Sequence, residues 1–320
     1  LYSAALPLDG WTTTIKARVR NGSDWSALGE AVFFRSDPPP LAVTEILSTP
    51  LQPSPSEAAA GFTDKDDFEF IELMNIGLEA LNLRDIRFVN GIDCTLADVV
   101  LAPGERGVVV RRPTAFRARY GDVPRIIGTF SLNLADGGEQ LALTSASGAI
   151  LSDFAFDTSA PWSVGPAGSS LVLRDPGLDP SSSANWRSSL SVGGSPAAVE
   201  GTTYAAWKAM HGILDDTSDS DADGLGAFLE YVTGGDPIRS DAAPHPSIDV
   251  SDGLVLVRYP HALQADDVTA TLMQSADLSE WAPATAEPVS AIAGADGVEL
   301  ITLRLSPPPE AHTFLSCLLY

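Results

Sequence analysis

Cysteine and histidine are scarce in this sequence, with two and four residues among 320. Cys94 and Cys317 lie in regions that we expect to belong to different domains, so we predict no disulfide framework and expect each to be a small buried apolar residue. No two histidines are spaced as in a zinc-protease helix, and neither a G-x-S-x-G motif nor a phosphate-binding glycine loop with lysine occurs. The sequence therefore predicts no enzyme and no catalytic residues, although paired carboxylates of the glycoside-hydrolase kind stay open.

Positive charge is also scarce, because 19 lysines and arginines stand against 42 aspartates and glutamates, a formal net charge of -23. A field of this sign repels nucleic-acid phosphates and anionic lipid, so we expect no nucleic-acid partner and no unassisted membrane docking. No apolar run reaches about 18 residues, so we expect no membrane span. The same field attracts divalent cations.

The sequence shows no signal peptide after Leu1 and begins almost at once in a strand-like pattern. We therefore expect a monomeric piece of a longer protein, and the resemblances described below imply that this protein is secreted or at the cell surface. Hydrophobic residues make up 44% and charged residues 19%, which is typical of globular modules, and the length predicts two or three domains.

Residues 11–35 alternate apolar and polar side chains on either side of a turn at Asn21–Asp24, which predicts a hairpin. It resembles the closing hairpin of a fibronectin-III-like or chitobiase-C-terminal-like module. We expect residues 1–36 to be an incomplete module with an unpaired sheet edge or support from the next domain. Residues 37–40 form a stiff proline linker.

Residues 41–200 contain many short apolar runs separated by Gly and Pro turns, which is typical of an antiparallel β-sandwich. Leu41–Leu47, Phe68–Asn75, Leu81–Phe88 and Val99–Val110 are expected strands, and residues 48–61 an expected loop. Pro113–Tyr120 is predicted to be a short helix that ends at Gly121. The period of two places nine residues in the core: Ile46, Phe70, Leu73, Leu83, Phe88, Val109, Leu141, Leu143 and Leu171.

The order of motifs in this region resembles bacterial lamin tail domains. The resemblance covers about half of the chain and rests on Phe70–Gly77, Leu81–Leu83, Leu134–Leu141, Pro161-Trp162, Gly168–Leu171, Asn185-Trp186 and Gly194–Pro196. It implies an immunoglobulin-like β-sandwich that serves as a spacer or as a binding module for a protein or a surface polysaccharide.

Several residues in the same region have both a structural and a functional interpretation. We expect Trp162 and Trp186 to fill the core rather than to form a ligand platform. Glu69 and Glu72 alternate with apolar residues, which favours a solvated strand face. The acidic group Asp64, Asp66 and Asp67 could bind a cation, but a solvated turn is the favoured interpretation.

Residues 201–240 contain an acidic loop between two predicted helices, 202–213, capped by Thr202 or Thr203, and 225–233. From Asp219 the loop fits D-x-D-x-D-G-x5-E, the spacing of an EF-hand calcium loop. Calcium takes about six to eight oxygen ligands, Gly224 permits the sharp turn, and the chain returns a glutamate from the second helix. The sequence therefore predicts one structural Ca²⁺ site, with the ligands Asp219, Asp221, Asp223, the carbonyl of Leu225, and Glu230; the alternative is a solvated linker.

Two departures accompany this pattern. Gly226 stands where EF-hands have an aliphatic residue, and Ile213–Ser218 separates the first helix from the loop. We find no second loop of this kind, so we expect a single EF-hand-like or dockerin-like site of weak affinity.

Residues 246–320 are predicted to form a smaller β domain, with strands at Leu254–Tyr259, Val268–Met273, Val298–Leu305 and Thr313–Leu319. Together with the acidic loop, this region resembles the C-terminal parts of large secreted bacterial proteins, some with an upstream CotH-kinase-like domain. The favoured function is a non-catalytic structural or adhesion region. The alternative is a carbohydrate-binding module, which exposed coplanar aromatic side chains would favour and buried Trp162 and Trp186 would not.

Overall fold

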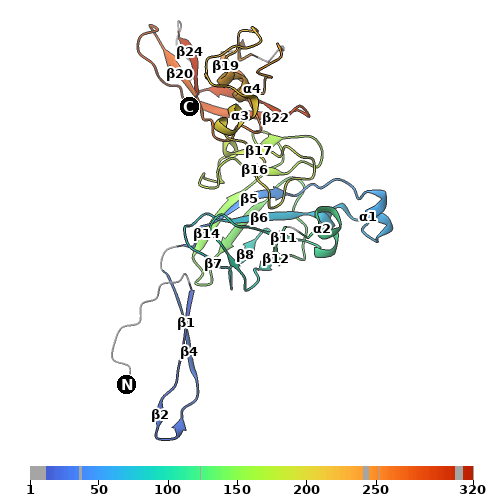
Figure 1. Cartoon of the computed structure of the whole chain (residues 1–320), viewed down its shortest axis with the longest axis vertical. Helices are drawn as coiled ribbons and strands as arrows, with labels where there is room; N and C mark the ends of the chain where they lie inside the picture. Colours follow the sequence, from blue (N-terminus) through green and yellow to red (C-terminus); the bar gives the residue numbers. More distant parts are fainter. Residues whose placement is uncertain are drawn as a thin grey trace.

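The computed structural model describes residues 12–35, 38–122, 124–240, 245–251, 253–306 and 313–319. The protein is mainly β, as the sequence predicts, with several sheets and few helices. Figure 1 shows a central body, a hairpin that projects from one end, and a second group of sheets and helices at the other. Among the described residues, no helix is both long and apolar enough to cross a membrane.

The central body is built on two sheets that share one core. The larger has the order β12-β11-β6-β5-β16-β17, and the smaller has the order β14-β13-β8-β9. A separate pair, β10-β7, extends the body. The bounds are β5 Leu41–Leu47, β6 Phe70–Asn75, β7 Leu81–Asn82, β8 Arg87–Asn90, β9 Cys94–Thr95, β10 Val100–Leu101, β11 Arg106–Val110, β12 Ile126–Thr129, β13 Gln140–Thr144, β14 Ile150–Ala155, β16 Leu171–Leu173 and β17 Trp186–Ser188.

All nine predicted core residues are buried, so their predicted burial is confirmed, although they do not all share one face. Eight of them lie in one cluster that joins the two sheets. Phe70 differs, because it lies on the other face of the large sheet and packs against Phe116 at 5.8 Å between ring centroids. Because both faces of β6 are covered, its glutamate Glu72 is buried as well.

The second face of the large sheet is covered by a helix that connects two strands. The helix was predicted, but the parallel pairing of the two strands was not. The helix α2 (Pro113–Tyr120) has the predicted bounds, begins with proline and ends at Gly121. It connects β11 to β12, and these two strands are parallel. The loop expected at 48–61 also contains a short helix, α1 (Pro55–Ala59), where Ser54 and Glu57 form a capping box.

Other predicted strands are interrupted or extended. The expected strand at 81–88 is divided into β7 and β8, because Asp85 has φ of 63° and turns the chain between them. Four further strands were not predicted: β9, β12, β17 and β15 (Ser163–Val164). The strand β15 joins a different sheet. Two 3-10 turns, Lys65–Phe68 and Ser183–Asn185, precede β6 and β17.

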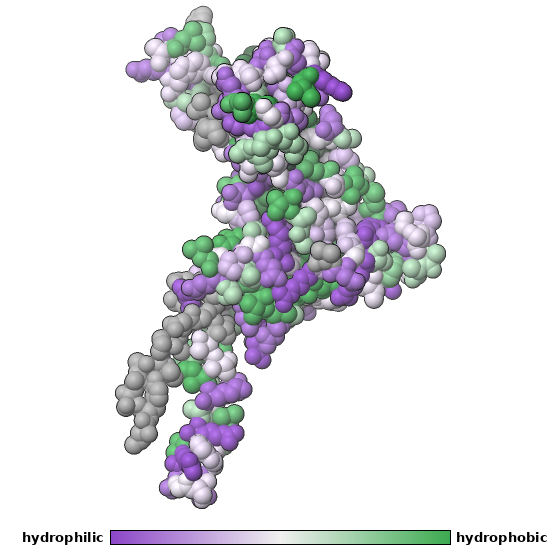
Figure 2. Space-filling view, in the orientation of Figure 1, coloured by the Kyte–Doolittle hydropathy of each residue, from purple (hydrophilic) through white to green (hydrophobic). Residues whose placement is uncertain are grey.

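The hairpin consists of two strand pairs in succession. The strand β1 (Thr12–Ala17) pairs with β4 (Gly29–Phe34), and β2 (Arg20–Asn21) pairs with β3 (Asp24–Trp25) at the tip. Both are two-stranded sheets among the described residues. Figure 2 shows polar and apolar residues interspersed along it.

The remaining elements form two helices and two sheets. The helices are α3 (Tyr204–His211) and α4 (Ala227–Thr233), and Thr203 caps α3 as predicted. One sheet has the order β15-β22-β23-β19-β18 and the other β21-β20-β24. The bounds are β18 Ser247–Ser251, β19 Leu254–Ala262, β20 Ala270–Ser275, β21 Ala282–Pro283, β22 Ala286–Ala293, β23 Val298–Leu305 and β24 Phe314–Leu319.

Candidate functional site

The acidic loop before α4 brings three aspartates together. Asp219, Asp221 and Asp223 each offer a carboxylate oxygen, and these oxygens lie within 4.8 Å of one another. The turn depends on Gly224, whose φ of +99° is disfavoured for residues with a side chain. Three of the predicted ligand side chains therefore converge where the loop motif places them.

The other two predicted ligands are placed differently. Glu230 is buried on α4, with 1% of its surface exposed, and it is not a member of the converging group. Leu225 follows the aspartates, and its N–H donates to Asp223 Oδ1 over 2.9 Å. A calcium ion bound by all five groups would need Glu230 to turn toward the loop.

Local hydrogen bonds and charges determine the electrostatics of this loop. The Asp219 carboxylate accepts from the N–H groups of Asp223 and Gly224 at 3.1 and 3.0 Å. Partial desolvation, with the charges of Asp223 and Asp219, raises the pKa of Asp221. Crowded carboxylates that resist ionisation favour any ligand that brings positive charge.

Aromatic packing fixes the two helices that flank the loop. Tyr204 and Trp207 of α3 contact Tyr231 of α4 with ring centroids 5.2 and 5.5 Å apart. The Tyr231 hydroxyl contacts both the carbonyl of Thr202 and the carboxylate of Asp267, either of which can accept its proton. The loop is thus held between elements that are already packed.

A second set of acidic residues is buried in the central body, and this corrects the prediction for Glu69 and Glu72. Both are fully buried rather than on a solvated face, because β6 is covered on both sides. Glu72 accepts from Thr44 Oγ1 at 2.6 Å, from Arg106 Nη1 at 2.8 Å and from the N–H of Ala197 at 2.6 Å.

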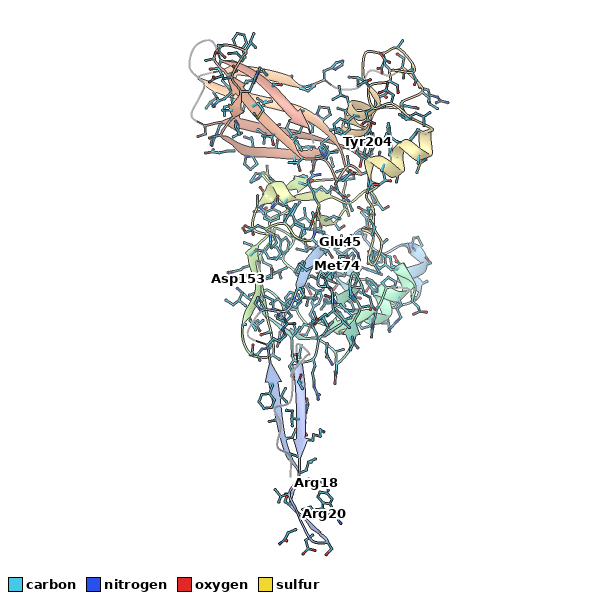
Figure 3. The ribbon with its side chains drawn as sticks, turned by 60° about the vertical axis from the view of Figure 1, so that its left-hand side comes forward. Arg18, Arg20, Glu45, Met74, Asp153 and Tyr204 are labelled. Carbon is cyan, nitrogen blue, oxygen red and sulfur yellow. The ribbon has the colours of Figure 1, made fainter. Side chains whose placement is uncertain are left out.

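Glu45 on β5 is a further buried acid of the central body, and its burial was not predicted. It lies inside the central body in Figure 3, and its Oε1 accepts from Ser170 Oγ and from the N–H of Ser195. Burial, reinforced by the charge of Glu72, raises its pKa to about 8. The available signal was a glutamate within the otherwise apolar run Leu41–Leu47.

The acidic group at 64–67 is also less solvated than predicted. Asp67 is 8% exposed and pairs with Arg111 at 3.0 Å and Arg112 at 2.7 Å. Asp64 pairs with Arg111 as well, at 3.2 Å. The solvated-turn interpretation is therefore wrong for Asp67, which is held by an ion-pair network.

Buried charges also link the central body to the C-terminal sheets. Arg187 is 1% exposed and binds Asp266 through Nε and Nη2 at 2.8 and 2.7 Å, and Glu200 through Nη1 at 2.9 Å. Arg174 and the hydroxyl of Ser163 both donate to Glu299, which is fully buried.

Backbone pairing reinforces this junction. The strand β15 leaves the central body and pairs in parallel with β22, with Ser163 opposite Ala291. His261, which is 4% exposed, lies in the same region, and burial together with the charge of Arg174 lowers its pKa to about 3. We call the contacts of Arg174, Arg187, Glu299 and β15 the junction.

A cavity of about 260 Å³ lies beside the junction. No charged residue lines it, and half of its lining residues carry hydroxyl groups: Ser48, Thr49, Thr158, Ser163, Ser169, Ser170 and Ser188. Among the described residues, the buried Oγ atoms of Ser169 and Ser188 have no hydrogen-bond partner. Gly165 leaves space there, since a Cβ at this position would lie 1.9 Å from Ser188 Oγ.

The two tryptophans of the resemblance are buried as predicted. Trp162 is 7% and Trp186 1% exposed, and their ring centroids are 6.0 Å apart in the core. Cys94 is buried with a free thiol, also as predicted, while the side chain of Cys317 lies outside the described residues.

Comparison with protein-family models, with curated proteins and with solved structures finds no match for this chain.

Proposed function

We propose that this chain is a non-catalytic structural and interaction region of a secreted or cell-surface multidomain protein, stabilised by calcium. The junction is the observation that carries the proposal. A shared strand and two sets of buried ion pairs fix the C-terminal sheets to the central body, which suits a spacer that must hold its shape. The partner would be a protein or a surface polysaccharide.

We also propose that the central body is an immunoglobulin-like sandwich of the lamin tail type. The support is that segments of the resemblance, far apart in sequence, meet in one buried network. Glu72 of the Phe70–Gly77 segment accepts from the N–H that follows Gly194–Pro196, and Ser170 of Gly168–Leu171 donates to Glu45. A Cβ on Gly194 would lie 2.4 Å from Glu45 Oε1, which accounts for glycine in that motif.

The calcium site of the proposal is the loop at 219–230, with a role in fixing α3 against α4. A ligand that binds only the folded state stabilises it by about 2.7 kcal/mol at a hundredfold excess over Kd. Millimolar Ca²⁺ should therefore raise the melting temperature of the chelator-treated protein, and Mg²⁺ should do so poorly because it needs a tight octahedron.

The matched variants are Asp219→Ala and Glu230→Ala, which should each reduce the calcium-dependent rise, with Asp153→Ala as an exposed control that should not. If calcium does not change the melting temperature of the wild type, the calcium-site interpretation is wrong and the loop is a solvated linker. A rise that survives Glu230→Ala but not Asp219→Ala would leave the ion bound by the aspartates alone.

Carbohydrate binding, as a module accessory to an upstream enzyme such as a CotH-kinase-like domain, is the second candidate. Buried Trp162 and Trp186 disfavour an aromatic platform, but the uncharged hydroxyl-lined cavity suits a small neutral sugar. Its volume is just below the roughly 300–1,000 Å³ of drug-sized sites, so one sugar ring is the expected ligand. Titration calorimetry with neutral monosaccharides tests this, and Ser188→Ala should abolish the heat whereas Ser147→Ala, which is outside the cavity, should not.

A further inference from the structure

A second group of carboxylates lies at the start of β6, far along the chain from the 219–230 loop. Asp66, Glu69 and Asp136 each offer one oxygen, and these oxygens lie within 4.8 Å of one another. Asp66 lies in the 3-10 turn, Glu69 follows it directly, and Asp136 comes from the loop between β12 and β13. Two segments of the chain about 70 residues apart thus present acids to one point.

Glu69 shows that this group lacks a ligand. Its side chain is fully buried, and Oε2 accepts from the N–H of Leu134 at 2.9 Å. Its Oε1, by contrast, is buried with no hydrogen-bond partner among the described residues. An orphaned buried carboxylate oxygen costs free energy unless a proton or a cation compensates it.

The ligand set indicates the kind of cation that fits. Carboxylate oxygens are the ligands that calcium takes, at about 2.3–2.6 Å, so two ligands on opposite sides of the ion are up to about 5 Å apart. The three oxygens lie within 4.8 Å of one another, which is inside that limit.

Neighbouring hydrogen bonds hold the two segments in place. Asn133 Nδ2 donates to Asp66 Oδ2 at 2.6 Å, and the Thr158 hydroxyl donates to the carbonyl of Asp136 at 2.7 Å. The Asp136 side chain is 64% exposed, which gives an ion a path from solvent.

Lys65 already places one positive charge at this point. Its Nζ lies 2.8 Å from Asp66 Oδ1 and 2.8 Å from Asp136 Oδ1, so the position favours a cation. The ammonium group leaves Glu69 Oε1 without a partner, and it sits at the end of a flexible side chain. Lys65 therefore acts as a competitor that a divalent ion must displace.

We propose that Asp66, Glu69 and Asp136 form a calcium site that ties the start of β6 to the loop before β13. This site is separate from the 219–230 loop, and it would stabilise the central body rather than the helix pair.

Calorimetric titration of the full chain with CaCl2 after chelation tests the proposal. The wild type should bind two ions, and the Asp219→Ala/Asp223→Ala variant should bind one. In that background, Asp136→Asn should weaken binding roughly tenfold or more, since it removes one of three charged ligands from an exposed position. Asp93→Asn, an exposed acid outside the group, should change nothing.

Lys65→Met should change the calcium affinity in the opposite direction to Asp136→Asn, and a mere structural defect would not increase this affinity. Removing the competing ammonium should tighten calcium binding in the same background, and Glu69→Gln should abolish it. If Asp219→Ala/Asp223→Ala shows no calcium heat while the wild type binds one ion, this proposal is wrong and the ion is bound by the 219–230 loop. If Asp136→Asn removes an ion that Asp219→Ala/Asp223→Ala does not, the ion is bound by Asp66, Glu69 and Asp136 and the proposed loop site is wrong.

Discussion

At the scale of single residues, the buried glutamates show where the sequence misleads. Alternation of Glu69 and Glu72 with apolar neighbours indicates a solvated face only if the other side of the sheet is bare. Here α2 covers part of that side through Phe116, and the segment at 195–197 covers another part. The contacts of the 195–197 segment join residues 150 and 125 positions apart, so no local pattern contains them.

Glu45 makes the stability of the fold depend on pH. A carboxyl with a pKa near 4.5 in the unfolded chain and about 8 in the folded one stabilises the fold fully below pH 4.5 and loses that contribution as the pH rises to 8. Each pKa unit corresponds to about 1.4 kcal/mol. Glu45→Gln should therefore flatten part of the fall in unfolding free energy between pH 5 and 8, as measured by urea denaturation.

Glu72→Gln is the matched comparison at the same buried network. Glu72 pairs with Arg106 at 2.8 Å, so neutralising it leaves a partly buried guanidinium without its counter-charge. We expect this variant to be destabilised at pH 7, by about 3–5 kcal/mol at most. Equal behaviour of the two variants across pH 5–8 would contradict the assignment of a neutral Glu45.

At the scale of elements, the sequence predicts one helix and several strands closely but misses others, including the eight-residue strand β22 (Ala286–Ala293). The helix at Pro113–Tyr120 and the strand at Leu41–Leu47 have the predicted bounds. Strands of two or three residues, such as β15 and β17, contain too few side chains to show a period. In the acidic loop, the three aspartates were predictable from spacing, whereas the burial of Glu230 depends on the packing of α4.

The pair between α1 and α2 gives a prediction at this scale. Arg119 binds Glu57 through two contacts of 2.9 and 3.0 Å, which lowers the pKa of Glu57 to about 2. A lowered pKa contributes stability above pH 4.5 that is lost as the pH falls toward 2.

Glu57→Gln should therefore cost about 1.5–3 kcal/mol at pH 7 and much less at pH 2, measured by denaturant unfolding. Asp122→Asn is the control, because Asp122 lies just past α2, pairs with Arg117 and is 88% exposed, and such pairs contribute little. An equal cost at both values of pH would show that Glu57 acts only through capping α1.

At the scale of the whole molecule, composition suggested boundaries near residues 200 and 246, yet the described structure has strong contacts across them. Arg174 meets Glu299 and Arg187 meets Asp266 over separations of 125 and 79 residues. These ion pairs depend on how the folded central body packs against the folded C-terminal sheets, and no periodic pattern in the sequence indicates them. The attachment of the C-terminal sheets to the central body could therefore not be predicted from the sequence.

The junction predicts that the central body and the C-terminal sheets unfold together. Differential scanning calorimetry of the wild type should show one transition for these two parts, because β15 and the buried ion pairs couple them. Arg174→Met leaves Glu299 buried with only the Ser163 hydroxyl and should cost about 3–5 kcal/mol. Because this stabilisation is lost from the junction that couples the two parts, the single unfolding transition should split into two.

Arg258→Met is the control for that experiment, since Arg258 lies on the same C-terminal sheet and its pair with Asp249 is exposed. It should shift stability by less than about 1 kcal/mol and keep one transition. Two transitions already present in the wild type would mean that the junction does not couple the parts, and the rigid-spacer function would lose its support. One transition that persists in Arg174→Met at lower temperature would instead place the coupling on Arg187 and β15.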